Sequence, residues 1–235
     1  MVKTPAIDTF TRRDAIRVSG RTLYWESMGR SDIGVLALQG DFEAHRKALG
    51  RCGVEARAVR LPGELETLRG LILPGGESTT LLRLLREYGF DAAIPRFVAG
   101  DGALYGTCAG AILVAREVLS PSQWSLGLID IAVERNGYGR QVDSFETELT
   151  DVVAELLAGT AADQPPTPLP AVFIRAPRIR RIGEGVVVLA SRGGEPVLVR
   201  DRRILLSTFH PELTQDCRVH GYFLNAVVGA PAPSA

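Results

Sequence analysis

The stretch from Leu104 to Ala115, LYGTCAGAILVA, decides the fold. It starts as a short apolar run, passes through a Gly-x-Cys-x-Gly core at Gly106–Gly110, and continues in small and branched residues typical of a buried helix. This is the pattern of a nucleophile elbow with sulfur in place of the serine oxygen, because flanking glycines allow a sharp turn from strand to helix that presents the middle side chain. The pattern predicts a strand, a tight turn at Cys108, and a helix.

Cys108 has two interpretations at this point. At a helix N-terminus its thiolate would be favoured by unpaired backbone N–H groups and by the positive end of the helix dipole, and the same N–H groups could hold an oxyanion. The alternative is a structural cysteine, since free cysteine is often buried and behaves as a small hydrophobe. The choice depends on whether a base and an orienting acid occur elsewhere in the chain.

Composition describes an ordinary soluble protein. The chain has 235 residues, 46% of them hydrophobic, with 27 basic and 27 acidic side chains. This balance gives no basic field for nucleic acid or an anionic membrane. Cys52, Cys108 and Cys217 lie far apart without a C-x-x-C pair, which argues against a zinc knuckle or a disulfide framework. With no apolar run of the ~20 residues that span a bilayer and no secretory signal, we expect a cytoplasmic protein.

Apolar runs followed by glycine-containing loops predict the fold class. Ile33–Leu38 ends at Gln39-Gly40, and Gly70–Leu73 ends at Pro74–Ser78. Such runs are typical of central parallel strands, whose carboxyl ends bind ligands in open α/β sheets. We therefore expect a single three-layer α/β domain, with a mostly parallel central sheet flanked by helices.

Further elements follow from the same patterns. We expect helices through His45, over Phe90–Ala99, and from about Cys217 to Val228. Additional strands are expected over the following ranges: Leu126–Val133, Val172–Pro177, Gly185–Ser191, and Pro196–Thr208 with a hairpin turn at Arg200–Arg203.

The loop after the second of these apolar runs carries polar groups suited to a ligand. Paired glycines let the backbone approach a bound molecule, while Glu77, Ser78 and Thr79 present oxygens at the start of a helix. A plain helix N-cap is the alternative interpretation. Arg135 lies in a second polar loop, where its guanidinium could grip a carboxylate or remain a solvated charge.

A base and an acid lie together near the end of the chain. His210 and Glu212 are two residues apart in a predicted strand end, where alternate side chains share a face, and Pro211 stiffens the backbone between them. A carboxylate bonded to an imidazole fixes its tautomer and stabilises the imidazolium. Together with Cys108, these residues give a nucleophile, a base and an orienting acid in the chain order Cys, His, Glu, which is the composition of a catalytic triad. His45 and His220 lie in helical stretches and have no comparable local support.

The segments outside the predicted domain, 33–229, have a different character. Residues 1–32 are polar, slightly basic and weakly periodic. We expect a flexible extension, or a segment that is present because the chosen start codon lies upstream of the true one. A proline-rich stretch at about 157–170 reads as an exposed insertion, and 230–235 as a tail.

The motifs together resemble a known family. Gly106–Gly110 with His210–Glu212 is similar to class I, triad-type glutamine amidotransferases. Further stretches narrow the resemblance to the family of glutaminase subunits of pyridoxal 5′-phosphate synthases. These stretches are IGVLALQG (Ile33–Gly40), LILPGGESTT (Leu71–Thr80), VERNGYGRQVDSFE (Val133–Glu146), VFIRAP (Val172–Pro177) and FHPELT (Phe209–Thr214).

The resemblance assigns roles to individual residues. It makes Cys108 the nucleophile, His210 the base and Glu212 its orienting acid. It implies that glutamine is held by the following residues: Gly76, Glu77, Ser78, Arg135, Ile174 and Arg175. Backbone N–H groups of Gly76 and Ala109 are the expected oxyanion donors, and Gln39 is expected at the contact with the partner. On charge alone, Glu77 suits the α-ammonium of glutamine and an arginine its α-carboxylate.

The implied function is hydrolysis of L-glutamine to L-glutamate and ammonia through a thioester. The ammonia would pass to a separate synthase subunit, in a large hetero-oligomer, for the synthesis of pyridoxal 5′-phosphate. The resemblance implies no cofactor and no metal in this chain. Two alternatives stay open: an amidotransferase that feeds a different synthase, and a non-catalytic regulatory subunit on the same fold.

Overall fold

A computed structural model describes residues 17–18, 21–22, 32–137, 144–157 and 168–229. Most of the predicted N-terminal extension and proline-rich insertion, and all of the predicted tail, lie outside the described residues. Within the extension, β1 (Arg17–Val18) and β2 (Arg21–Thr22) pair antiparallel.

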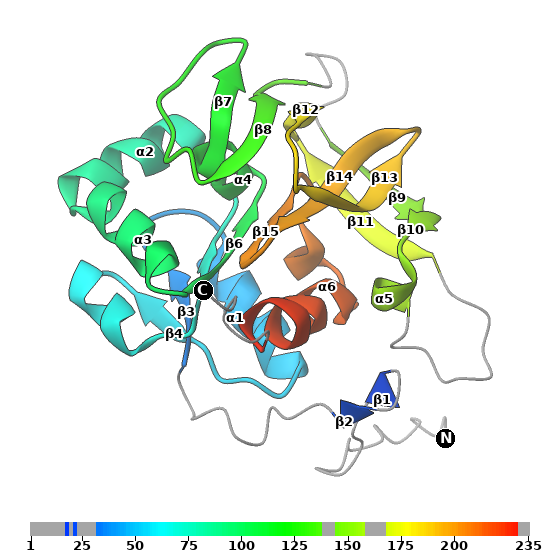
Figure 1. Cartoon of the computed structure of the whole chain (residues 1–235), viewed down its shortest axis with the longest axis horizontal. Coiled ribbons are helices and arrows are strands. Elements are labelled where there is room, and N and C mark those ends of the chain that lie inside the picture. Colours follow the sequence, from blue (N-terminus) through cyan, green and yellow to red (C-terminus); the bar gives the residue numbers. More distant parts are fainter. Residues whose placement is uncertain (1–16, 19–20, 23–31, 138–143, 158–167, 230–235) are drawn as a thin grey trace, which may run out of the picture.

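An eight-stranded sheet forms the centre of the molecule (Figure 1). Its parallel part lies in the order β4-β3-β5-β6-β15, the arrangement of a flavodoxin-like doubly wound sheet. These strands are β3 (Ile33–Leu36), β4 (Arg57–Val59), β5 (Gly70–Leu73), β6 (Ala103–Thr107) and β15 (Ile204–Ser207). The predicted α/β class with a mostly parallel sheet is confirmed.

Antiparallel strands extend this sheet beyond β15. They are β14 (Glu195–Asp201), β13 (Val187–Arg192) and β10 (Asp151–Val152). Two smaller sheets lie beside it: β11 (Leu169–Ile174) with β9 (Ser144–Leu149), and β12 (Arg178–Ile182) with β8 (Ile129–Glu134) and β7 (Ala115–Leu119). The expected hairpin between β14 and β15 is confirmed, with Arg202 at φ 48° in its turn.

Helices cover both faces of the central sheet (Figure 1). One face carries α2 (Ser78–Glu87), α3 (Phe90–Ala99) and α4 (Ala109–Val114). The other carries α1 (Phe42–Arg51), α6 (Arg218–Tyr222) and the π-helical segment η4 (Phe223–Val228). Shorter helical segments are η2 (Pro62–Thr67), α5 (Ala154–Leu157) and η3 (Pro211–Leu213).

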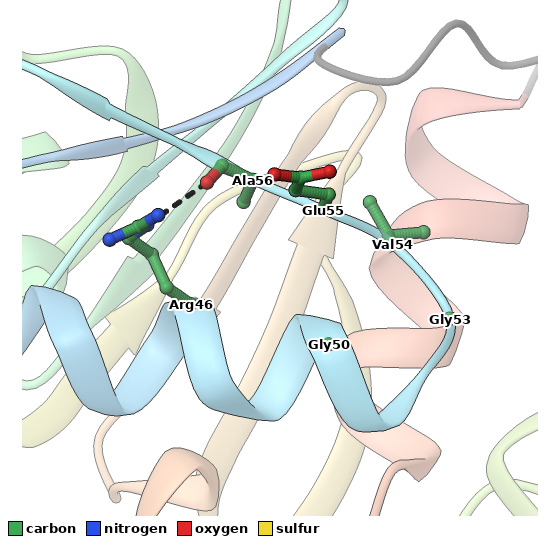
Figure 2. A pocket seen from close by; sticks show the side chains of 6 residues that line it. All are labelled: Arg46, Gly50, Gly53, Val54, Glu55 and Ala56. Atoms are coloured by element: carbon green, nitrogen blue, oxygen red, sulfur yellow. Dashed lines mark hydrogen bonds between the residues drawn. The ribbon is translucent and has the colours of Figure 1, made fainter.

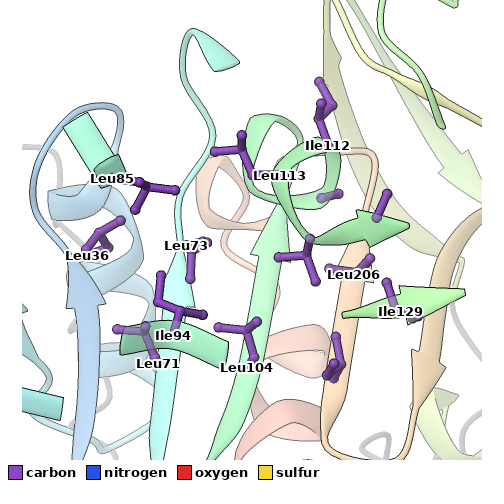
Figure 3. Close-up of a cluster of buried hydrophobic side chains, with 14 of the residues drawn as sticks. Leu36, Leu71, Leu73, Leu85, Ile94, Leu104, Ile112, Leu113, Ile129 and Leu206 are labelled. Carbon is purple, nitrogen blue, oxygen red and sulfur yellow. The ribbon is translucent and has the colours of Figure 1, made fainter. Parts of the chain in front are cut away.

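Alternation along the buried strands divides the core in two. Leu71 and Leu73 of β5 belong to the cluster under α2, α3 and α4, whereas Ile72 belongs to the cluster under α1 and α6. A strand repeats its side chains with a period of two, so a continuous apolar run serves both faces at once. Figure 3 shows the first of these clusters, which includes Leu71, Leu73 and Leu104 from the strands and Leu85 and Ile94 from the helices.

Some predicted boundaries are wrong. The strand expected over Leu126–Val133 is β8, Ile129–Glu134. The proline-rich insertion was expected to reach Pro170, but this residue lies in β11 opposite Glu148. Proline cannot donate to a strand ladder, yet β11 belongs to a two-stranded sheet, and every such strand has an open edge where no donor is required.

Replacing Leu71 with alanine tests the core. Leu71 is fully buried, and such a truncation typically costs about 2–5 kcal/mol because a cavity remains. We expect the melting temperature to fall by at least about 5 °C, measured by circular dichroism. Leu61→Ala is the matched control, because Leu61 is 60% exposed, and should change the melting temperature little. Equal effects of the two variants would contradict the assigned core.

Candidate functional site

Four adjacent parallel strands end at the same edge of the sheet, and the polar groups predicted from sequence follow them. Gln39 comes after β3, the Gly75–Ser78 loop after β5, Cys108 after β6, and His210 after β15. The carboxyl ends of parallel strands are where open α/β sheets bind ligands. The sheet therefore brings these groups to one place, although they are far apart in the chain.

The backbone at Cys108 has an unusual conformation. Its φ is 48° and its ψ is −102°, between the end of β6 and the first residue of α4. Its amide donates to the carbonyl oxygen of Ser207 at 2.9 Å, which ties the turn to β15. Non-glycine residues in such regions store strain and cluster at functional sites. The predicted strand-to-helix elbow is present.

Two glycines make this turn possible. A Cβ at Gly110 would lie 2.3 Å from the carbonyl oxygen of Leu73, and one at Gly106 would lie 2.8 Å from the carbonyl carbon of Gly110. Real Cβ atoms do not approach so closely, so β5, β6 and α4 pack at this distance only with glycine at both positions.

The Cys108 thiol is 6% exposed and donates to the carbonyl oxygen of Ile174 at 3.8 Å. The following residue, Arg175, is exposed and has φ 42°, so the backbone turns sharply beside the thiol. The amide of His210 donates to the carbonyl oxygen of Val172, in the same strand as Ile174, at 2.8 Å. β11 therefore holds both the thiol and the imidazole.

His210 and Glu212 form a short hydrogen bond. His210 Nδ1 lies 2.7 Å from Glu212 Oε1, and both residues are 4% exposed. The pairing was predicted from alternation along a strand, and that reason is wrong. β15 ends at Ser207, His210 has φ −110° and ψ 83°, and Glu212 lies in the short 3-10 helix η3. Proline at the first helical position begins this turn, which swings the carboxylate back to the imidazole.

The pKa values of His210 and Glu212 are shifted in opposite directions, and both shifts favour the charged forms. Burial alone would lower the pKa of His210, but its hydrogen bonds to Cys108 and Glu212 outweigh burial and raise the pKa to about 10. Burial would raise the pKa of Glu212, but the neighbouring His45 and the hydrogen bond from His210 lower it to about 2. An imidazole between a thiol and a carboxylate is the arrangement of a nucleophile, its base and an orienting acid.

Gly75 and Gly76 bring the loop after β5 against this pair. A Cβ at Gly75 would lie 2.4 Å from His210 Cε1 and 3.4 Å from Cys108 Cβ. Gly76 has φ 155°, and a Cβ there would lie 2.5 Å from Gln39 Oε1. That oxygen accepts a hydrogen bond from the Glu77 amide at 3.1 Å. Gln39 therefore holds the peptide between Gly76 and Glu77 in place.

Glu77 caps α2 and also lies near an arginine. Its carboxylate accepts from the amides of Thr79 and Thr80 at 3.2 and 2.7 Å, so the N-cap interpretation holds. Arg135 Nη2 lies 3.7 Å from Glu77 Oε1 and donates to Thr79 Oγ1 at 3.0 Å. Ser78 is buried and donates to Gln123 Oε1 at 3.3 Å. The loop after β5 and the turn after β8 thus bring a carboxylate and a guanidinium side by side.

Comparison with known proteins decides the family. The SNO glutamine amidotransferase family model matches residues 35–229. The chain belongs to the SNO glutamine amidotransferase family. It is 55% identical over 197 residues to a pyridoxal 5′-phosphate synthase subunit PdxT of Thermus thermophilus, covering 83% of this chain and 97% of that relative. PdxT of Deinococcus radiodurans is 52% identical over 82% of this chain and 95% of its own length.

Solved structures agree with the family. A crystal structure of a glutamine amidotransferase has a TM-score of 0.76 and 50% sequence identity, and the match covers 85% of this chain and all of that one. PurLQS from Thermotoga maritima has a TM-score of 0.61 at 18% identity, which shows a shared fold.

Two buried histidines beside His210 and Glu212 were not predicted to belong to this site. His45 Nε2, from α1, lies 3.5 Å from Glu212 Oε2 and 3.1 Å from Thr107 Oγ1. His45 Nδ1 lies 3.1 Å from His220 Nε2, from α6. All three histidines of the chain therefore join one connected group with Glu212. The one signal in the sequence was that the chain has only three histidines. Helical periodicity shows which face of a helix is buried, but not which other helix packs against that face.

A surface pocket lies away from Cys108, His210 and Glu212. It has a volume of about 310 Å³ and lies between the end of α1 and the start of β4, at the opposite edge of the parallel sheet (Figure 2). Its one basic side chain, Arg46, donates to the Ala56 carbonyl oxygen at 3.0 Å and to Glu43 at 2.9 Å. Glu55 is the other charged residue in the lining, and no His, Cys or Ser lines the pocket beside it.

Two further observations concern the described part of the chain. None of its helices is long and apolar enough to cross a membrane. Its His, Cys, Asp and Glu side chains form no group of three or more that could hold a metal ion.

Gly110→Ala tests the elbow. We expect a lower melting temperature and at least a 10-fold slower reaction of Cys108 with iodoacetamide, because the new methyl group meets the Leu73 carbonyl oxygen. Mass spectrometry of the Cys108 peptide measures the rate. In Gly221→Ala the methyl group of a helical residue enters open space, so this control should be neutral or stabilised by up to about 1 kcal/mol. A normal Cys108 rate in Gly110→Ala would show that the close packing is not required.

His210 should make stability depend on pH. Its pKa is about 10 in the folded protein and 6.5 ordinarily, so its contribution is complete below pH 6.5 and is lost as the pH rises toward 10. The melting temperature of the wild type should therefore exceed that of His210→Gln most at pH 6.5, and the difference should shrink toward pH 10. Calorimetry across this range measures it. A difference that grows with pH would contradict the raised pKa.

Proposed function

We propose that this chain is the glutaminase subunit of a pyridoxal 5′-phosphate synthase, and that Cys108, His210 and Glu212 hydrolyse L-glutamine to L-glutamate and ammonia. The observation that carries the proposal is the arrangement of a thiol on a strained elbow, an imidazole that packs against the same glycine as that residue, and a buried carboxylate that fixes that imidazole. Membership in a glutamine amidotransferase family supports the same chemistry.

The first half-reaction releases ammonia. The Cys108 thiolate attacks the carbon of the side-chain amide, and the carbonyl oxygen becomes an oxyanion. Glu212 occupies Nδ1 of His210, so the proton moves at Nε2, from the imidazolium to the leaving nitrogen. The carbon–nitrogen bond breaks, ammonia leaves, and a glutamyl thioester remains on Cys108.

The second half-reaction releases glutamate. His210, now neutral, takes a proton from water at Nε2, and the hydroxide attacks the thioester carbon. The carbon–sulfur bond breaks, glutamate leaves, and the thiolate–imidazolium pair returns. Glu212 stays ionised throughout, because its pKa of about 2 lies far below neutral pH.

We assign the oxyanion donors to the N–H groups of Ala109 and Gly76. Ala109 is the first residue of α4, where backbone N–H groups lack intrahelical acceptors. Gly76 lies in the loop that packs on His210 and Cys108. Each aligned donor contributes roughly 3 kcal/mol to the transition state. Gln39, which fixes the peptide after Gly76, couples this loop to the surface where the synthase subunit would dock.

We assign the amino-acid end of glutamine to the neighbouring charged groups. The Glu77 carboxylate suits the α-ammonium, and the Arg135 guanidinium suits the α-carboxylate with its fork of donors. The Ile174 carbonyl beside the thiol, the turn at Arg175 and the buried Ser78 complete the walls.

The partner follows from the relatives. Two of them are named as subunits of pyridoxal 5′-phosphate synthase. We therefore propose that ammonia passes to a separate synthase subunit within a large hetero-oligomer in the cytoplasm.

Cys108→Ala tests the nucleophile. With the cognate synthase subunit present, we expect glutamate release to fall by at least about 10³-fold, as when a triad nucleophile is removed. Cys52→Ala and Cys217→Ala are controls that should keep the activity of the wild type. Wild-type activity in Cys108→Ala would overturn the assignment. An assay without the partner, and one with a different ammonia-consuming synthase, separates the proposal from an amidotransferase that serves another acceptor.

A further inference from the structure

The carboxylate of Glu212 has a second oxygen that the triad does not use. Oε1 accepts from His210, while Oε2 is completely buried and has no hydrogen-bond partner within ordinary distance in the described residues. Its nearest basic group is His45 Nε2, at 3.5 Å. A buried carboxylate is costly unless each oxygen faces a donor, so the proton position on His45 decides whether this site is favourable.

The surroundings of His45 select one tautomer. If Nδ1 carried the proton, Nε2 would present a lone pair to the Glu212 carboxylate, and the two would repel. If Nε2 carries the proton, it donates to Thr107 Oγ1 at 3.1 Å with Glu212 Oε2 3.5 Å away, and Nδ1 accepts from His220 Nε2. The protonated form is disfavoured, because burial lowers the pKa of His45, with His210 adding to the effect and Glu212 and Asp41 opposing it.

His220 completes this arrangement. It is fully buried, and burial together with the adjacent His45 lowers its pKa to about 3, with Arg51 adding to the effect and Glu212 opposing it. A neutral His220 that donates from Nε2 has an acceptor at Nδ1, which is the buried atom left without a hydrogen-bond partner. The opposite tautomer would place an unsatisfied N–H at the buried Nδ1, which costs more free energy than an unsatisfied acceptor there.

We infer that His45 is a positioning residue for the glutaminase: its Nε2–H holds the second oxygen of Glu212, so that the first stays on His210, and His220 fixes the tautomer that makes this possible. The inference rests on the proposed function for its effect on catalysis. It extends the triad from Cys108, His210 and Glu212 through His45 on α1 to His220 on α6. His45 is fully buried, so it acts through Glu212 rather than on the reacting atoms.

The alternative is that His45 only fills space between α1 and the sheet. Leucine fills a similar volume without a donor, whereas the glutamine side chain places an N–H at the same number of bonds from Cα as Nε2 of histidine. A structural role predicts that both replacements behave alike. A positioning role predicts that His45→Gln keeps the reactivity of Cys108 that His45→Leu loses.

The test compares His45→Leu with His45→Gln in the full chain. The first readout is the pH dependence of Cys108 alkylation by iodoacetamide, which needs neither glutamine nor the partner. We expect His45→Leu to narrow the pH range of the reactive thiolate–imidazolium pair and to slow alkylation about 10- to 100-fold at neutral pH, with His45→Gln close to wild type. Lys47→Leu, an exposed neighbour on α1, is the matched control and should keep the wild-type profile.

The second readout is glutaminase activity with the synthase subunit. We expect His45→Leu to lower kcat about 10- to 100-fold with little change in KM, and His45→Gln to recover most of it. If the wild type itself released no glutamate, the proposed function would fail while the alkylation result still stood. An unchanged alkylation profile in a folded His45→Leu would overturn the inference.

The third readout covers the case in which His45→Leu does not fold. Nitrogen-15 spectra of histidine-labelled wild type report which ring nitrogen of His45 is protonated. A proton on Nε2 supports the inference. A proton on Nδ1 contradicts it.

Discussion

The packing of β5, β6 and α4 around the backbone of Cys108 is the constraint on which this molecule depends. The residue has φ 48° and ψ −102°, a conformation of the kind that costs about 1–3 kcal/mol. It persists because β6 on one side and α4 on the other are fully buried, and Gly106 and Gly110 let their backbones approach. Core burial thus stabilises a strained turn that places a thiol at the N-terminus of a helix.

The other groups of the site reach that thiol through the topology of the sheet. Parallel strands end at one edge of the sheet, so Gly75 and His210 lie beside Cys108 without being near it in the chain. Glycine at position 75 allows the imidazole to sit directly over the loop. The site therefore depends on which strands are adjacent. Two further polar side chains are His45 of α1, which lies next to Glu212, and His220 of α6, which lies next to His45.

Much of the fold was predictable because the signals are local. Continuous apolar runs gave the central strands, and the elbow pattern gave the turn at Cys108. The juxtaposition of His210 and Glu212 was also predicted, but for the wrong physical reason, since a 3-10 turn rather than strand alternation joins them. The end of the insertion was placed too late, at Pro170, because a proline in a strand with an open edge has the same sequence signal as a proline in a loop.

The support behind the triad could not be predicted, because it is a matter of helix packing. His45 and His220 are 175 residues apart, and each looks like an ordinary buried position on an amphipathic helix. The roles of Glu77, Arg135, Ser78, Ile174, Arg175 and Gln39 in holding glutamine or a partner stay predictions. The structure does show Glu77 beside Arg135, and Gln39 bound to the same loop.

The central claim is that Cys108 becomes acylated by glutamine. The direct measurement is acid quench of the chain with its synthase subunit during turnover of carbon-labelled glutamine, followed by mass spectrometry of the three cysteine peptides. The account predicts a glutamyl thioester on the Cys108 peptide and none on those of Cys52 and Cys217. Glutamate release without label on Cys108, or label on another cysteine, would contradict it.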